Sequence, residues 1–257
     1  MKSLLLCTFN ITIHIFIMTV VFCMADDENI WAVQSDEKNR NEKRIDEKYI
    51  YEAIPVVKRS VEEKEIIRME IVSTGNGFSL TSETIGKNRL EVIRILTDKY
   101  GNFVSGTKET LRQSAEQTHR EVIRRYDEKI YVESISKAGE KIKGYKIPDS
   151  MRMAVDMSLL VLLRSFPFNT NEPWEVYMVD FSQNHISVTI KQAGEEHVIV
   201  PAGGFECYRI EVTINLPVVK PMIIFWLAKK DPHFLVKHSG MKGPFTLPSI
   251  TTLVSIE

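Results

Sequence analysis

From Tyr49 onward, hydrophobic and polar residues alternate in short segments separated by turn-forming residues. The first four segments read YIYEAIPVV, KEIIRMEIV, GFSLTSETI and RLEVIRILT. A short break follows each of the last three segments. In order, the breaks are Thr-Gly-Asn-Gly, Ile-Gly-Lys-Asn and Lys-Tyr-Gly-Asn. An apolar residue at every second position predicts a half-buried strand, and glycine with asparagine between such runs predicts antiparallel hairpins.

Residues 107–126 fit two patterns. A helix would place four of their apolar residues on one face: Leu111, Ala115, Val122 and Tyr126. The stretch IRRYDEKIYVESISKAGEKIKGYKI instead alternates as strands that turn at Asp127-Glu128 and at Ala138-Gly139. We favour strands from about Glu121 onward and leave the structure of 107–126 open.

One segment has the period of a helix. The run PDSMRMAVDMSLLVLLRSFPF (148–168) begins with Asp149 or Ser150 as a candidate N-cap and reaches Pro167 as a stop signal. Its apolar residues form a broad face made by Met153, Met157, Leu160 and Val161, with Arg164 beyond them. Such a face predicts a helix that packs against a sheet or fills its open side.

Alternating segments resume after this helix and continue to the C-terminus. They read WEVYMVDF, HISVTIKQ, EHVIVPAG, FECYRIEVTI, MIIFWLAK, FLVKHS and ITTLVSI, with breaks at positions such as Gly194, Gly203-Gly204 and Asp231-Pro232. Many short strands with one helix predict a mainly β protein: one curved antiparallel sheet that forms an open β-barrel, with one helix packed against it.

The N-terminus has the layout of a secretory signal. One lysine precedes a largely apolar run from Leu4 to Ala25, and acidic residues follow. The small residues Cys23 and Ala25 favour cleavage before Asp26, whereas an uncleaved membrane anchor and lipidation at Cys23 are the alternatives. Three parts are expected: a signal peptide at 1–25, a flexible charged linker at 26–48 and the barrel domain at 49–257.

An exported chain of this kind is expected in the periplasm or cell envelope. Membrane association is expected only if the N-terminal segment is retained or lipidated. The formal net charge of −1 argues against nucleic acid as a partner, because such proteins carry a basic domain or stripe. Of the three cysteines, only Cys207 lies outside the signal peptide, so the mature chain has no partner for an internal disulfide.

The stretch from Pro148 to Glu257 resembles the bacterial domain of unknown function 3108 family. The matching pieces are DMSLLVLLRSFPF, PAGGFECYRIEV, IIFWLAKKDPHFLVK and ITTLVSI. A proline that the family usually has after its tryptophan strand is missing from HFLVKHS. The resemblance implies an exported envelope protein with an open, strongly curved barrel similar to the periplasmic lipoprotein carriers of the LolA type. It implies no catalytic residues.

The sequence contains no catalytic or metal-binding signature, and we expect neither an enzyme nor a cofactor. Gly-x-Ser-x-Gly is absent, and the histidines lack the spacings that bring two ligands to one metal. Cys207 could act as a nucleophile only with a lowered pKa, and His185 or His197, on flanking strands, could supply imidazole help. Its position on an alternating strand favours a packed, inert thiol.

The feature most suggestive of function is apolar and aromatic. If the barrel is hollow, the helix and the facing strands would line a cavity for an acyl chain. The residues expected to line it are Met153, Met157, Leu160, Trp174, Phe225 and Trp226. The sequence thus predicts a non-enzymatic envelope protein that binds an acyl chain, a lipid or a lipidated polypeptide. The alternative is an envelope module with a filled core that contacts another protein through its sheet edges.

Overall fold

The computed structural model describes residues 46–56, 64–112, 118–136, 139–148, 151–170, 172–181, 185–218, 220–241 and 248–257. All of them belong to one unit, residues 44–257. The expected signal peptide and almost all of the expected linker lie outside the described residues. The first strand, however, begins at Asp46, so the last three residues assigned to the linker are part of the sheet.

Within the described ranges, the chain forms fifteen strands and one short helix. The first arm of the sheet contains β1 (Asp46–Pro55), β2 (Glu65–Thr74), β3 (Gly77–Gly86), β4 (Arg89–Asp98), β5 (Phe103–Arg112), β6 (Thr118–Tyr126), β7 (Lys129–Ser136) and β8 (Gly139–Lys146). The second arm contains β9 (Arg152–Val155), β10 (Trp174–Val179), β11 (His185–Val200), β12 (Gly203–Ile214), β13 (Met222–Ala228), β14 (Leu235–Met241) and β15 (Pro248–Ile256). The helix α2 (Ser158–Leu163) lies between β9 and β10 in the sequence.

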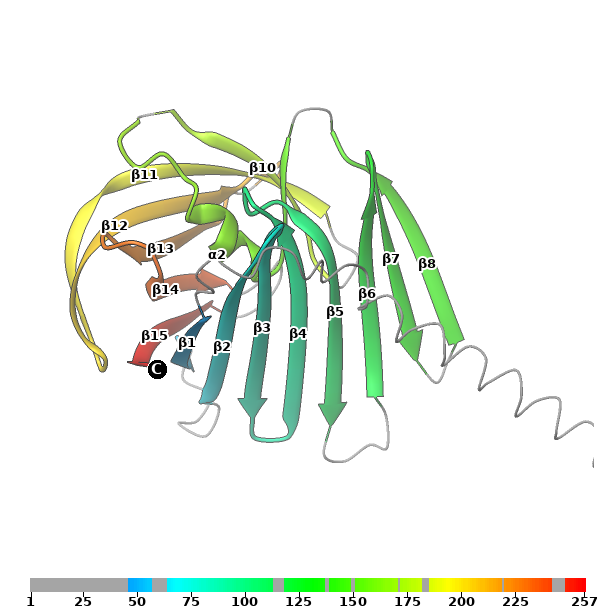
Figure 1. The fold of residues 1–257 in the computed structure, drawn as a ribbon, viewed down its shortest axis with the longest axis horizontal. Helices are drawn as coiled ribbons and strands as arrows, with labels where there is room; N and C mark the ends of the chain where they lie inside the picture. Colours follow the sequence, from blue (N-terminus) through cyan, green and yellow to red (C-terminus); the bar gives the residue numbers. More distant parts are fainter. Residues whose placement is uncertain are drawn as a thin grey trace, which may run out of the picture. The chain divides into compact units, whose positions relative to one another are not determined.

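The strands join into one sheet whose centre is the pairing of the first strand with the last. The order is β8-β7-β6-β5-β4-β3-β2-β1-β15-β14-β13-β12-β11-β10-β9. Apart from β9, the strands of each arm form a meander of antiparallel hairpins, as the alternating pattern predicts. The two arms curve toward each other around α2, and the end strands β8 and β9 do not pair (Figure 1). The expected open, curved sheet with one helix against it is therefore confirmed.

The segment expected to be one long helix is instead a strand, a turn and a short helix. Residues 152–155 pair with β10, and this pairing is parallel, so the sheet is not antiparallel throughout. Asp156 then has φ +47°, which ends the strand, and α2 contains only six residues. The amides of Arg164 and Ser165 bond three residues back, which tightens the end of the helix before Pro167. Periodicity cannot separate a short buried strand from a buried helix, and pairing with β10 decided the outcome.

Two other expectations are resolved by strand pairing. The ambiguous region forms β5 and β6, so its described residues are strands, and β6 begins at Thr118 rather than near Glu121. The break expected at Gly194 is only a bulge, and β11 continues through it to Val200. A bulge lets a strand bend without ending, which suits the long, strongly curved β11–β12 hairpin.

The core occupies the space between α2 and the two arms. All six residues of α2 are buried, and they belong to one cluster with side chains from both arms. Gly101, in the β4–β5 turn, has φ +83° and lies directly against the α2 backbone. A Cβ atom there would be 2.7 Å from the Cα of Leu162. No described helix has the length and apolar character required to span a membrane.

Candidate functional site

The residues expected to line a cavity all belong to one large hydrophobic cluster or pack against it. Met153, Leu160, Phe225 and Trp226 are buried, whereas Met157 and Trp174 are half-buried and pack against the core. Phe225 and Trp226 are neighbours on one strand, so they point to opposite faces of the sheet. Of these six residues, only Trp174 lines the cleft described below.

Trp226 takes part in a network of charged side chains. Its Nε1 donates a hydrogen bond of 2.8 Å to Glu196 Oε2, and Lys237 Nζ lies 4.8 Å from its ring centre. The other oxygen of Glu196 pairs with Arg209, which also pairs with Glu211. These contacts satisfy the indole and cover its face, so Trp226 is explained by strand-to-strand packing.

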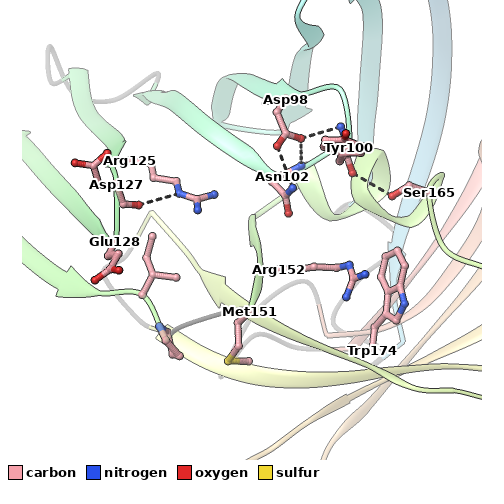
Figure 2. Close-up of a pocket in the computed structure, with 12 residues that line it drawn as sticks. Asp98, Tyr100, Asn102, Arg125, Asp127, Glu128, Met151, Arg152, Ser165 and Trp174 are labelled. Carbon is pink, nitrogen blue, oxygen red and sulfur yellow. Dashed lines mark hydrogen bonds between the residues drawn. The ribbon is translucent and has the colours of Figure 1, made fainter.

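An open cleft of about 770 Å³ lies where the turns of the first arm approach the start of the second arm (Figure 2). The first arm contributes its β4–β5 and β6–β7 turns. The other side of the cleft is formed by the β8–β9 connection, the start of β9, the end of α2 and the start of β10. The lining residues are Asp98, Tyr100, Asn102, Arg125, Asp127, Glu128, Ile147, Pro148, Met151, Arg152, Ser165 and Trp174.

The upper wall of the cleft in Figure 2 is a turn held by Asp98. Its carboxylate accepts hydrogen bonds of 2.8 Å from the backbone amides of Tyr100 and Asn102, and one of 3.0 Å from the Asn102 side chain. Ser165, just after α2, donates a hydrogen bond of 3.0 Å to the Tyr100 carbonyl. The turn is therefore rigid and tied to α2, and the Asp98 carboxylate is occupied by its own turn.

Two arginines supply positive charge to the cleft. The Arg152 guanidinium lies 3.8 Å from the centre of the Trp174 ring, and Arg125 Nε donates to the Asp127 carbonyl at 3.3 Å. Neither guanidinium has a carboxylate partner among the described residues. Figure 2 shows the Arg125 side chain directed toward the middle of the cleft, whereas the carboxylates of Asp127 and Glu128 point away.

This arrangement suits a ligand with an anionic group next to an apolar part. A guanidinium offers a planar set of donors that fits carboxylate or phosphate, and stacking on Trp174 fixes the plane of Arg152. Met151 and Trp174 provide apolar surface next to the two cations. The polar and charged residues of the cleft were not singled out from the sequence as ligand-binding residues. Turn composition indicated that the two turns exist, but only the fold brings them together.

A second group of charged residues lies inside the curve of the sheet. Lys108 Nζ is 3.2 Å from Glu91 Oε2, and Lys108 pairs across the sheet with Glu121, whose burial raises its pKa. Lys108 also lies 5.9 Å from the ring centre of Phe181, in the segment after β10. Burial raises the pKa of Asp156 to about 6, although the charge of Lys108 opposes that change. This cluster links the two arms at a point that is separate from the cleft-lining residues.

Cys207 is fully buried and has no disulfide partner among the described residues. Burial raises the pKa of its thiol to about 12, and the nearby carboxylates of Glu206 and Glu196 add to the effect. His197 pairs with Glu206 at 2.7 Å. A thiol in this state is not a nucleophile at neutral pH, which confirms the packed cysteine predicted from the alternation. Within the described ranges, no group of three or more metal-binding side chains is assembled.

Comparison with known proteins supports the fold and gives no family assignment. No family model and no curated protein matches the sequence. A barrel-like protein of domain of unknown function 1849 from Brucella abortus has 12% identity and a TM-score of 0.56, with 82% of this chain and 96% of that chain covered. The two chains thus share a barrel-like fold, and the resemblance to family 3108 stays a prediction.

Two further structures match with lower TM-scores. A protein provisionally described as a lipoprotein, from Parabacteroides distasonis, has 12% identity and a TM-score of 0.33, covering 82% of this chain and 94% of that chain. A protein provisionally described as exported, with a YmcC-like fold, comes from Bacteroides fragilis. It has 10% identity and a TM-score of 0.30, covering 82% of this chain and 95% of that chain. At these scores, neither contributes to the assignment of function. The chain is therefore similar to barrel-like proteins of unknown function.

Proposed function

We propose that this protein is a non-enzymatic, exported cell-envelope protein that binds an acyl chain, a lipid or a lipidated polypeptide at the mouth of its open barrel. The observation that carries the proposal is the cleft in which Arg152 stacks on Trp174 while Arg125 faces the same space. The anionic group of the ligand binds the two guanidinium groups, and its apolar part lies along Met151 and Trp174.

The size and lining of the cleft support an amphiphilic ligand. Its volume of about 770 Å³ lies within the usual range for small-molecule sites. Met151 supplies an adaptable apolar contact, as methionine does in sites that accept flexible ligands. The core behind the cleft is packed around α2. The proposed site is therefore displaced from the interior residues Met153, Leu160 and Phe225 toward the mouth near Trp174.

Export and the absence of catalysis rest on different grounds. Export rests on the apolar N-terminal run and the acidic residues that follow it. The buried thiol of Cys207 argues against cysteine chemistry, and the charge cluster around Lys108 is occupied by ion pairs that join strands.

Binding of a fluorescent fatty acid and of its methyl ester to the purified full chain tests this proposal. We expect the acid to bind more tightly than the ester, because only the acid carries the charge that the two arginines recognise. The double variant Arg125→Gln/Arg152→Gln should weaken binding of the acid by about tenfold or more and remove the preference over the ester. Native mass spectrometry of the same preparation should detect co-purified lipid.

Arg94→Gln/Arg112→Gln is the matched control, because it removes the same charge from β4 and β5 at exposed positions outside the cleft. It should leave both affinities unchanged. Absence of fatty-acid binding and of co-purified lipid in the wild type would contradict the proposal. Equal loss in the cleft and control variants would mean that only net charge matters.

A second candidate function is contact with another protein through a sheet edge. One observation favours it: the sheet ends at β8, in which seven residues are exposed and Tyr145 is half-buried. An edge of this kind can accept an added strand.

A further inference from the structure

We infer that the free edge of β8 binds an extended segment of a partner polypeptide in which acidic and apolar residues alternate, added to the sheet as a further strand. This inference does not depend on ligand binding at the cleft. It rests on the exposure of β8, on an apolar patch beside it, and on the charge of the opposite face.

The two ends of the sheet differ in how accessible they are. At one end, β9 has only four residues, three of them fully buried, and it packs against α2 and β5. At the other end, β8 has eight residues, and Tyr145 contacts His185 of β11 at 4.8 Å between ring centres. This contact covers the C-terminal end of β8. The remaining stretch, from Gly139 to Lys143, extends away from the second arm (Figure 1).

An exposed apolar patch lies on one face of β6, β7 and β8. Pairing places Tyr131 opposite Arg124 and Gly144, and it places Glu133 opposite Ile142. Residues that alternate with these share the same face. The patch comprises Tyr126, Tyr131, Ile135 and Ile142, which are 58%, 38%, 37% and 60% exposed. The opposite face carries the buried Ile130 and Val132, so the patch is not part of the core.

The other face of the edge is positively charged. Lys143 pairs across the sheet with Val132, and Lys141 pairs with Ser134, so both lysines are on the face opposite to Ile142. Both are exposed, and neither has a carboxylate partner among the described residues. An added strand would therefore meet Lys141 and Lys143 on one face and Ile142, flanked by Glu140, on the other, with the apolar side chains of β6 and β7 beyond it.

This charge pattern decides between a second copy of the chain and a different partner. Two β8 strands paired with each other would bring lysines from both copies onto a shared face, and like charges opposite each other are destabilising. Lysines on an edge strand protect it against such self-pairing. An incoming strand whose acidic residues face Lys141 and Lys143 has complementary charge, and its apolar residues extend the patch at Ile142.

The test uses a labelled peptide of about eight residues that alternates valine and glutamate, the length of a typical strand. Fluorescence anisotropy with the full chain should show saturable binding that weakens with salt. The variant Lys141→Glu/Lys143→Glu should weaken this binding by about tenfold or more and should bind an alternating valine–lysine peptide instead. Ile142→Ser should weaken binding of the acidic peptide without reversing the charge preference.

Two controls separate strand addition from simple attraction of charges. Lys220→Glu/Lys230→Glu makes the same change in charge at exposed turns of the second arm and should leave binding unchanged. A peptide of the same composition in the order VVVVEEEE should bind more weakly, because only alternation presents one face to each side of the sheet. Hydrogen exchange of residues 139–146 should slow when the alternating peptide binds, since an added strand pairs with the free backbone groups.

Three results would overturn the inference. The first is no saturable binding of the alternating acidic peptide by the wild type. The second is equal binding by the Lys141→Glu/Lys143→Glu variant. The third is a dimer, detected by analytical ultracentrifugation, that Ile142→Ser dissociates, because this would assign the edge to a second copy. Loss of fatty-acid binding in the Arg125→Gln/Arg152→Gln variant leaves this inference unaffected, so the two proposals can fail separately.

Discussion

Arg164 and Glu47 form a two-pronged ion pair between residues that are 117 positions apart in the chain. The guanidinium donates from Nη1 to Oε1 at 3.1 Å and from Nη2 to Oε2 at 2.7 Å. Tyr49 also donates to Glu47, at 2.6 Å. Both charged side chains are nearly buried, with 12% and 13% of their surfaces exposed. The pair fixes the end of α2 to the start of β1 and so helps to set where the helix sits within the sheet.

Replacing Arg164 with methionine should destabilise the protein by about 3 kcal/mol, because it leaves the Glu47 carboxylate nearly buried without its cation. Urea unfolding measures the change in free energy. The matched control is Lys48→Met, which breaks an exposed pair with Glu70 and should change stability by less than about 1 kcal/mol. Equal effects of the two substitutions would show that the Arg164 pair does not anchor α2.

Gly101→Ala should destabilise the protein by about 3 kcal/mol, because strain at positive φ adds to a steric clash. The new Cβ would lie 2.7 Å from the Cα of Leu162. Because this Cα is a backbone atom, a change of side-chain rotamer cannot relieve the clash. Thermal unfolding measures the loss. Gly194→Ala is the control, because Gly194 also has positive φ but has no atom within 4 Å of the added Cβ. The Gly194→Ala variant should lose only about 1 kcal/mol of stability. A similar loss of stability at both positions would rule out the clash with α2.

Asp156 should make the protein less stable as the pH rises. Because its folded pKa of about 6 lies above the ordinary value of 3.8, the folded state binds the proton more tightly than the unfolded state does. The contribution of the protonated Asp156 carboxyl to stability is complete below pH 3.8 and is lost as the pH rises through 6. Between pH 4 and pH 7.5, the free energy of unfolding of the Asp156→Asn variant should rise by on the order of 2 kcal/mol relative to that of the wild type.

Urea unfolding at several pH values tests this prediction. Asparagine tolerates the positive φ of this position, so the substitution removes charge without changing the turn. Glu172→Gln, at an exposed position, is the control and should follow the wild type. A constant difference in stability between Asp156→Asn and the wild type at all pH values would contradict the raised pKa.

Cys207 should resist a thiol reagent in the native protein at pH 8, because its thiol is buried and its pKa is raised to about 12. Labelling of a protein that comprises residues 26–257, in which Cys207 is the one cysteine, followed by mass spectrometry, should show modification only after denaturant is added. Rapid labelling under native conditions would contradict this state and would reopen a chemical role for the cysteine.

Strand composition and turn chemistry were predictable from the sequence over most of the described chain. Alternation with glycine and asparagine turns indicated the hairpins from β2 to β5, and the Asp231-Pro232 turn lies where it was expected. The break expected at Gly203-Gly204 lies two residues earlier, at Pro201-Ala202, and both glycines belong to β12. These signals are local, because each strand pairs with its neighbour in sequence. The burial of Cys207 followed from the same alternation.

The bounds of the helix and the residues of the cleft could not be predicted from the sequence, because both depend on the tertiary structure. The apolar run near Met153 became a strand because it pairs with β10, and Gly194 continued a strand because a bulge was available. The expected cavity residues were chosen by apolar character, but apolar side chains fill the core whether or not a ligand binds. Arg125 and Arg152 carry no apolar signal, and they become neighbours of one cleft only when the arms curve toward each other.

The sequence by itself determined that this chain is mainly β, that it is built from hairpins, and that a helix lies between the two groups of strands that the structure describes. These properties follow from period-two alternation and turn residues, which act over a few positions. The tertiary structure decided that β1 pairs with β15, that β8 is left as a free edge, and that the β4–β5 and β6–β7 turns line one cleft with Trp174. Those relationships join residues far apart in sequence, and no local pattern encodes which strands become neighbours.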